Sequence, residues 1–217
     1  MGRRRFLTTN QARFITFEGG EGCGKSTQAA ALVAALRRKG VGNDPLLTRE
    51  PGGSPGAEAI RRLLVTGDPG RWDGLSETFL HCSVRCDHLR RTIRPALAAG
   101  RWVVCDRFID SMFAYQGGGQ GVEMSVLRTL ATLVIGSFKP DLTILLDLPP
   151  ELGLRRATAL HRHERQDLAF HHRVREVFLA LAAAEPERFI VVNADMTIPD
   201  VHAAVWAAVV GRFPRHA

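Results

Sequence analysis

The sequence predicts an α/β fold in which a five-stranded parallel sheet is flanked by helices. Five short apolar runs are of the kind that forms buried parallel strands. Segments with helical spacing of apolar residues lie between them, and a glycine-rich loop separates the first run from the first such segment. With 217 residues, 45% of them hydrophobic and 24% charged, the chain is long enough for one domain with a sizeable core.

The expected elements alternate along the chain. The first strand covers residues 13–18 and the first helix residues 25–39. Further strands are expected at 45–48, 102–105, 142–146 and 189–192, and further helices at 57–64, 76–97, 125–135, 151–158, 168–184 and 199–211. Such alternation indicates a doubly wound parallel sheet, whose ligands bind beyond the carboxyl ends of the strands. The residues that directly follow each strand are therefore candidates for the site.

The chain is expected to form a single domain. This domain covers residues 13–213, and the basic segment 1–12 before it is expected to be a disordered tail. The segment at about 158–166 is too polar for the core and lies between two expected helices, which indicates a mobile lid. No linker or internal repeat divides the sequence.

Composition limits the class of protein. The net charge of +7 arises largely from arginines near the two ends, such as Arg3, Arg4, Arg5 and Arg215, so we expect no nucleic-acid partner. No apolar run approaches the roughly 18 residues of a membrane helix, so we expect no membrane partner either. Four irregularly spaced cysteines and the lack of a secretory signal favour a reducing compartment, the cytoplasm.

A glycine-rich loop follows the first expected strand. The segment from Gly19 to Ser26 fits the pattern G-x-x-x-x-G-K-[ST] between a strand and a helix. Glycines allow successive amide N–H groups to surround phosphate oxygens, and the helix dipole adds positive potential. Lys25 would reach the β and γ phosphates, and the hydroxyl of Ser26 would serve Mg²⁺. The predicted ATP-binding residues are Gly19, Gly20, Glu21, Gly22, Cys23, Gly24, Lys25, Ser26 and Thr27.

The remaining motifs favour phosphoryl transfer over hydrolysis. The sequence contains no N-K-x-D motif of the kind that reads guanine in GTPases. Asp106 and Asp147 end apolar runs, and neither is followed by a glutamate that could position water. A phosphate loop without a water-activating residue, accompanied by cations at the same edge, suggests transfer to a second phosphorylated substrate.

Two arginines follow the second and third strands. Arg49 and Arg107 both fall on the expected ligand edge, where their guanidinium groups could hold a phosphate monoester. In the alternative interpretation each pairs with its neighbouring acid, Glu50 or Asp106. Arg85, on the helix expected at 76–97, could reach the same cleft and face a base carbonyl.

Three motifs give the chain a family resemblance. They are FEGGEGCGKST at Phe17 to Thr27, TREPGG at Thr48 to Gly53 and DRFIDSMFAYQGGG at Asp106 to Gly119. In these motifs, and in order and spacing from about residue 13 to residue 213, the chain resembles the thymidylate kinase family, of the bacterial type with lid arginines. The resemblance implies a P-loop nucleoside monophosphate kinase-like fold, transfer of the γ-phosphoryl group of ATP to dTMP with Mg²⁺, and a role in dTTP synthesis.

The resemblance also assigns residues. It implies catalytic roles for Lys25, Glu21, Arg107, Arg156 and Arg162, and metal binding by Ser26 and Asp106. It implies a dTMP site made of Glu21, Arg49, His81, Arg85, Arg107, Ser111, Tyr115 and Gln116. It further implies a homodimer in which the helices expected at 76–97 and 125–135 pack across a two-fold axis.

Departures from the family pattern leave two alternatives open. Met112 stands where the family usually has a small or polar residue, and His81 stands where many members place a ring against thymine. These changes are compatible with a kinase for another pyrimidine nucleoside monophosphate. The lid reads His161-Arg-His-Glu164 where D-R-x-E is common, and it is some three residues short, which is compatible with a nucleotide-binding paralogue that no longer catalyses.

Overall fold

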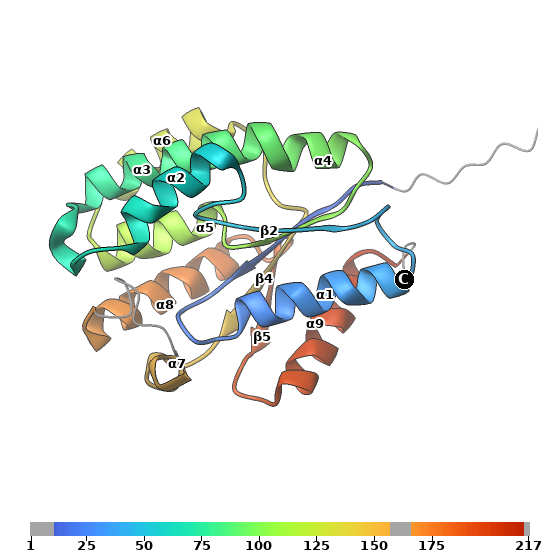
Figure 1. The fold of residues 1–217 in the computed structure, drawn as a ribbon. Coiled ribbons are helices and arrows are strands. Elements are labelled where there is room, and N and C mark those ends of the chain that lie inside the picture. Colours follow the sequence, from blue (N-terminus) through green and yellow to red (C-terminus); the bar gives the residue numbers. More distant parts are fainter. Residues whose placement is uncertain (1–10, 157–165, 215–217) are drawn as a thin grey trace, which may run out of the picture.

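The computed structural model describes residues 11–156 and 166–214, which surround a parallel sheet with strand order β2-β3-β1-β4-β5 (Figure 1). The strands are β1 (Phe14–Glu18), β2 (Leu46–Arg49), β3 (Val103–Asp106), β4 (Leu142–Asp147) and β5 (Phe189–Asn193). All four strand pairs are parallel. The predicted five-stranded parallel sheet is confirmed, and each strand begins and ends within one residue of its expected range.

Strand β1 is the middle strand of the sheet, and every one of its residues is buried. It pairs with β3 on one side and with β4 on the other. In this register Phe17 lies opposite Asp106, and Glu18 lies opposite Leu145. The carboxyl ends of the three central strands are therefore nearly level, so the residues that follow them meet at one edge.

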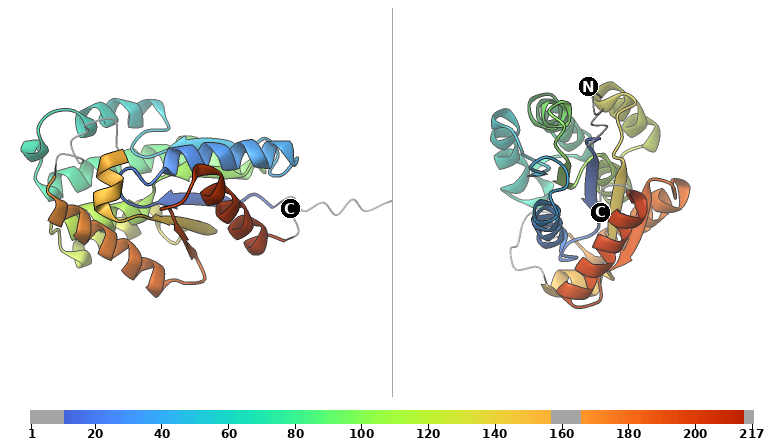
Figure 2. Two further views of the ribbon diagram at one scale, coloured as in Figure 1. Left: turned by 90° about the horizontal axis from the view of Figure 1, so that it is seen from below. Right: turned by 90° about the vertical axis from the view of Figure 1, so that its right-hand side faces the viewer.

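One face of the sheet is covered by α1 (Lys25–Arg38) and α9 (Ile198–Arg212), which lie together in Figures 1 and 2. In each strand every second side chain points to this face, and these side chains form one cluster with the apolar residues of α1 and α9. The cluster includes Ile15, Phe17, Leu32, Ile144 and Val205. Because β1 alternates, Phe14, Thr16 and Glu18 belong to the opposite face.

The opposite face is covered by a larger set of helices, drawn above the sheet in Figure 1. They are α2 (Pro55–Val65), α3 (Gly74–His88), α4 (Arg94–Ala98) and α6 (Met124–Ile135), and α8 (Leu168–Ala184) packs beside β4 and β5. The short helices α5 (Ile109–Met112) and α7 (Pro150–Arg156) begin shortly after β3 and β4. These two helices therefore lie at the carboxyl edge of the sheet.

Two segments differ from the sequence prediction. The helix expected at 76–97 is interrupted by a π-helical turn at Leu89–Ile93, just before Pro95, whose missing amide hydrogen removes one helical hydrogen bond. Residues 109–119 are helical, with a π-helical segment at Phe113–Gly119, although no helix was predicted there. A Cβ on Gly119 would lie 2.4 Å from the ring of Phe170 in α8, so glycine is required by packing.

Some of the predicted features lie outside the described residues. The expected tail at 1–12 is described only at residues 11 and 12, and the expected lid at 158–166 only at residue 166. Across residues 11–156 and 166–214, every helix is either too short or too polar to cross a membrane.

Candidate active site

The phosphate loop connects β1 directly to α1. Gly19 has a φ of 137°, and a Cβ there would lie 2.4 Å from the carbonyl oxygen of Leu146 in β4. Gly24, which precedes the first residue of α1, has a φ of 90°. Residues with a side chain rarely adopt either backbone conformation, so the two glycines allow the loop to fold back against the sheet and to enter the helix. The sequence motif is thus explained by local backbone geometry.

Lys25 lies inside this loop. Its side chain is buried, and its Nζ donates a hydrogen bond to the Gly20 carbonyl oxygen at 2.6 Å. The Cys23 thiol donates to the same carbonyl at 3.1 Å. The ammonium group and the N-terminus of α1 therefore present positive potential at one point, which suits an anion such as phosphate.

Ser26 and Asp106 bring two oxygen groups together at the mouth of the loop. The hydroxyl of Ser26, in the first turn of α1, donates to the carboxylate of Asp106 at the end of β3. Oxygen ligands of this kind suit Mg²⁺, which usually binds through few protein groups together with phosphates and water. The chemistry of this pair therefore fits the metal role that the family resemblance implies.

Arg107 follows β3 and reaches across to the phosphate loop. Its Nη1 donates to the Gly19 carbonyl oxygen at 3.0 Å, and its Nη2 donates to a Glu21 carboxylate oxygen at 3.0 Å and to the Tyr115 hydroxyl at 2.9 Å. The guanidinium also lies over the Tyr115 ring, 4.7 Å from its centroid. The alternative in which Arg107 pairs with Asp106 is wrong, because the carboxylate that it contacts belongs to Glu21.

The contacts among Arg107, Glu21 and Tyr115 shift the pKa values of the arginine and the tyrosine. Burial opposes ionisation of Arg107, but the oxygens of Tyr115 and Glu21 reverse that effect and raise its pKa well above the usual value. Burial also raises the pKa of Tyr115 well above its usual value, and its hydroxyl donates to Glu21 at 2.8 Å. At neutral pH the site therefore holds a guanidinium cation beside a neutral phenol.

A cavity opens beside Arg107 and gathers most of the predicted acceptor site. Its walls include seven of the eight predicted dTMP-binding residues, namely Glu21, His81, Arg85, Arg107, Ser111, Tyr115 and Gln116. Met112 lies in the same wall, as its departure from the family pattern led us to expect. The eighth residue, Arg49, is half exposed and donates to Glu58 at 2.9 Å. The alternative in which Arg49 pairs with Glu50 is therefore also wrong.

Arg85 is held in the cavity wall by buried partners that the sequence did not reveal. Its guanidinium contacts the Glu50 carboxylate at 2.7 Å and donates to the Phe108 carbonyl oxygen at 3.0 Å. Glu50 is also 3.1 Å from Nδ1 of His88. The sequence around Glu50 does not indicate this role, because both of its partners lie on a helix more than 30 residues away.

A second buried glutamate orients Gln116. Both Gln116 and Gln120 donate from Nε2 to the same oxygen of Glu77, at 2.9 and 3.0 Å. This contact fixes the amide of Gln116, because the nitrogen must face Glu77.

The predicted lid arginines are only partly described. Arg156 ends α7, and it donates to the Ala194 carbonyl oxygen at 3.0 Å and to Asp195 at 2.9 Å. These contacts hold it to the segment between β5 and α9. Arg162 lies outside the described residues.

Comparisons with known proteins agree with this geometry. The family model for thymidylate kinase matches residues 17–205. The chain is 51% identical over 207 residues to the thymidylate kinase of Magnetococcus marinus, covering 94% of this chain and 98% of the relative. It is 50% identical over 205 residues to that of Caulobacter vibrioides, covering 93% and 98%. A crystal structure of thymidylate kinase from Ehrlichia chaffeensis superposes with a TM-score of 0.75 at 36% identity, covering 91% and 98%. The chain therefore belongs to the thymidylate kinase family.

Proposed function

We propose that this chain transfers the γ-phosphoryl group of ATP to dTMP and releases dTDP. The observation that carries the proposal is the contact between two anion-binding groups. Arg107, in the wall of the acceptor cavity, donates to Gly19 of the loop that encloses Lys25. A donor phosphate at the loop and an acceptor phosphate at Arg107 would therefore be neighbours, as direct transfer requires. The activity of the family to which the chain belongs supports this reading.

The protein contributes mainly position and charge to this reaction. Lys25 would bind the β and γ phosphates, and Arg107 would hold the acceptor phosphate in line with them. Ser26 and Asp106 would hold Mg²⁺, which supplies positive charge to the phosphates when bound. Arg156, after leaving Asp195, and Arg162 would add positive charge around the transferred group.

The cavity wall would select the nucleoside. Arg85 would donate to a base carbonyl, since its guanidinium is fixed by Glu50. Gln116 would lie beside the base, and Tyr115 would pack under the deoxyribose and exclude a 2′-hydroxyl. Glu21 would meet the sugar 3′-hydroxyl from the phosphate loop.

A kinase for another pyrimidine monophosphate is the second candidate. It is favoured by one observation, the buried Met112 in the cavity wall together with His81. A thioether and an imidazole there would change the shape of the base site relative to the family pattern. The shared phosphate-binding groups would be unaffected.

We further propose that the chain works as a homodimer in the cytoplasm. A groove of about 590 Å³ lies between α3 and α6, lined by residues such as Phe79, Cys82 and Leu130. Half or more of Phe79 and Leu133 is exposed on these helices, which suits an interface with a second copy. The four cysteines are all free, which supports a reducing compartment.

The proposed function is tested by measuring ADP release with ATP, Mg²⁺ and one acceptor at a time. The acceptors are dTMP, dUMP, UMP, dCMP, AMP and dGMP, with a reaction lacking acceptor as the blank. We expect dTMP to give turnover well above the others. A different preferred pyrimidine would favour the second candidate, and ATP binding without any turnover would indicate a non-catalytic paralogue.

The phosphate loop is tested by Lys25→Ala. We expect turnover to fall by at least about a hundredfold, because a buried cation at the transferred phosphate is lost. The matched control is Lys139→Ala, which removes an exposed lysine paired with Glu185 and is expected to keep full activity. Retained activity in Lys25→Ala would contradict the assignment of the loop.

A further inference from the structure

Arg107 has a backbone conformation that needs support. Its φ is 67°, in the left-handed region that side chains rarely adopt. Its own amide donates to the Phe17 carbonyl oxygen at 2.9 Å, which ties the residue to β1. The next part of the turn is held by a different strand residue, Glu18. Arg107 can keep this conformation only if these neighbours fix the turn on both sides.

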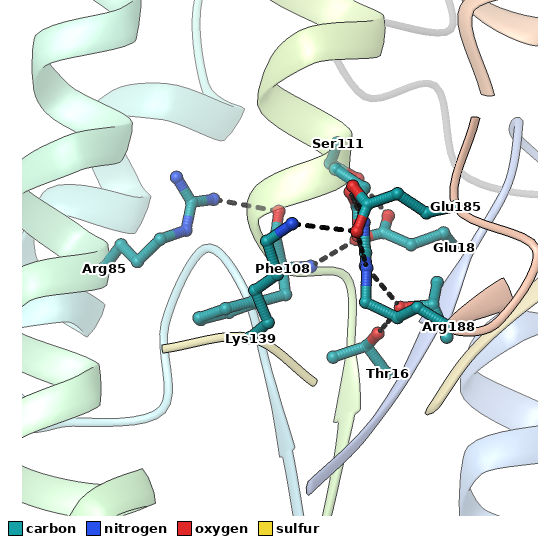
Figure 3. A network of polar contacts seen from close by, with 10 residues as sticks. Thr16, Glu18, Arg85, Phe108, Ser111, Lys139, Glu185 and Arg188 are labelled. Atoms are coloured by element: carbon teal, nitrogen blue, oxygen red, sulfur yellow. Dashed lines mark hydrogen bonds and ion pairs between the residues drawn. The ribbon is translucent and has the colours of Figure 1, made fainter. Parts of the chain in front are cut away.

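Glu18 holds this turn with both of its carboxylate oxygens. Oε1 accepts a hydrogen bond from the Phe108 amide at 2.8 Å, and Oε2 accepts one from the Ser111 hydroxyl at 2.6 Å. Figure 3 shows Glu18 joined to both residues. Arg107 in turn lies 3.2 Å from the same hydroxyl through Nη1. A hydrogen-bond chain therefore runs from Arg107 through Ser111 to Glu18.

Glu18 is fully buried, at 0% exposure, and its surroundings make this carboxylate unusual. Burial and the neighbouring charge of Asp110 raise its pKa to about 7, while Ser111, Arg107 and the Phe108 amide act in the opposite direction. Asp110 itself is held by two hydrogen bonds from Arg188, at 2.7 and 2.8 Å.

A further titratable group near Glu18 is the Cys105 thiol of β3. Burial raises its pKa well above the usual value, and the charge of Glu18 acts in the same direction. This thiol is therefore neutral near pH 7 and adds no charge beside Glu18. The charges that act on the Glu18 carboxylate are those of Asp110 and Arg107, and Asp110 is itself paired with Arg188.

We propose that Glu18 is a positioning residue for the acceptor phosphate, because it fixes the turn and the side chain of Arg107 through Ser111. This inference rests on the proposed function, in which Arg107 binds that phosphate. The direction of the chain matters. The Arg107 N–H can donate to Ser111 only while the Ser111 hydroxyl hydrogen points to Glu18, which requires an oxygen there that accepts.

An amide at position 18 cannot replace the carboxylate. It has one accepting oxygen and one donating nitrogen, so it can satisfy either the Phe108 amide or the Ser111 hydroxyl, not both. A protonated Glu18 has the same limitation. In both cases the Ser111 hydroxyl hydrogen loses its acceptor at Glu18, so the hydroxyl is free to rotate and its contact with Arg107 is no longer fixed. Glu18→Gln therefore fixes the chain in the state that the wild type reaches at low pH.

The experiment measures steady-state kinetics of the wild type and Glu18→Gln with dTMP and ATP between pH 6 and 8. We expect the KM for dTMP to rise about tenfold at pH 8 in the variant, the factor set by loss of one hydrogen bond to a charged group. The KM for ATP should stay within about twofold, since Lys25 contacts Gly20 and Cys23, neither of which belongs to this chain of hydrogen bonds. In the wild type the KM for dTMP should fall as the pH rises through 7, and in Glu18→Gln this change should be absent apart from the titration of the dTMP phosphate, which both proteins share.

Thr16→Val is the matched control for a general loss of stability. Thr16 lies on the same strand and face as Glu18, and its buried hydroxyl is 2.9 Å from that of Thr143. The variant loses a buried hydrogen bond without touching the turn at Arg107. We expect it to be less stable and to keep the wild-type KM for dTMP.

Ser111→Ala serves if Glu18→Gln does not fold. It breaks the same chain one step nearer to Arg107, so the pH dependence of the KM for dTMP should flatten as well. A direct contact between Ser111 and substrate would raise this KM without changing its pH dependence. Wild-type turnover with an unchanged pH profile in these variants overturns the inference alone, whereas absence of dTMP turnover in the wild type overturns the proposed function and the inference with it.

Discussion

Glu18 illustrates how one residue can serve a site at a cost to the fold. A buried carboxylate is expensive, and here its desolvation is only partly offset by the Phe108 amide, Ser111 and Arg107. The same residue fixes the turn that presents Arg107. We therefore expect its effect on stability to depend on pH in a direction opposite to that of an ordinary ion-paired carboxylate.

The pH dependence of unfolding tests this residue without any assay of activity. The folded-state pKa of Glu18 is about 7 against an ordinary 4.5, so its contribution to stability is fully present below pH 4.5 and is lost as the pH rises through 7. Glu18→Gln removes this dependence. In urea unfolding between pH 5 and 8, the free energy of unfolding of the variant should increase relative to that of the wild type as the pH rises, by up to about 3 kcal/mol.

Titration of Glu185 does not disturb this comparison. The Arg188 side chain, followed by Lys139, lowers the pKa of Glu185 to about 2, so that residue loses its stabilising contribution only as the pH falls from 4.5 through 2. This window lies below the measured range. Thr16→Val should follow the pH slope of the wild type, and a parallel slope in Glu18→Gln would show that Glu18 titrates at an ordinary pH.

At the scale of elements, α7 and the phosphate loop meet backbone to backbone. A Cβ on Gly153 in α7 would lie 2.2 Å from the Glu21 carbonyl oxygen, and one on Gly22 would lie 1.9 Å from the Gly153 carbonyl oxygen. Neither glycine can be replaced without moving the loop or the helix. The short helix α7, which precedes the segment predicted to be a lid, is thus packed directly on the loop that is expected to hold ATP.

Gly153→Ala should therefore damage the site although residue 153 has no assigned role in binding. We expect a roughly hundredfold loss in kcat/KM for ATP, because the phosphate loop must move by about 1 Å to make room for the added methyl group. Gly211→Ala in α9 is the matched control, since a Cβ there meets no atom within 4 Å. It should leave activity unchanged and stabilise the fold by about 0.5–1 kcal/mol through helix propensity. Wild-type kinetics in Gly153→Ala would show that the contact can relax.

At the scale of the whole molecule, the helices on the two faces of the sheet expose different apolar side chains to solvent. Helices α3 and α6 expose Phe79 and Leu133, at 53% and 77%, beside the groove between them. On the other side of the sheet α9 exposes Ile198, at 65%. The groove together with the two apolar side chains is the surface that we propose a second copy covers.

Sedimentation tests the proposed dimer. We expect the wild type to have the mass of two chains and Leu133→Glu to shift toward one, because a charge would be buried in the interface. Ile198→Glu places the same change on the opposite side and should leave the mass unaltered. A wild type with the mass of one chain would remove the proposal.

Several residues of the site were predictable because their signals are local. The glycines at 19 and 24, Lys25 and Ser26 form a contiguous pattern whose spacing follows from the turn itself. The arginine at 107 follows a predicted strand, with only Asp106 between them. By contrast, the role of Glu50 depends on Arg85 and His88, which reach it only after α3 packs against the end of β2.

The sequence by itself determined the parallel sheet, the phosphate loop and the family, since each depends on patterns within a few residues or on motifs in a fixed order. Only the tertiary structure decided which groups pair. Arg107 contacts Glu21, 86 residues away, rather than its neighbour Asp106, and Glu18 accepts from the Phe108 amide, 90 residues away. Partners at such separations are set by the register of β1 against β3, which no local pattern encodes. The same register places Glu18 of β1 beside the turn after β3, where it supports the site.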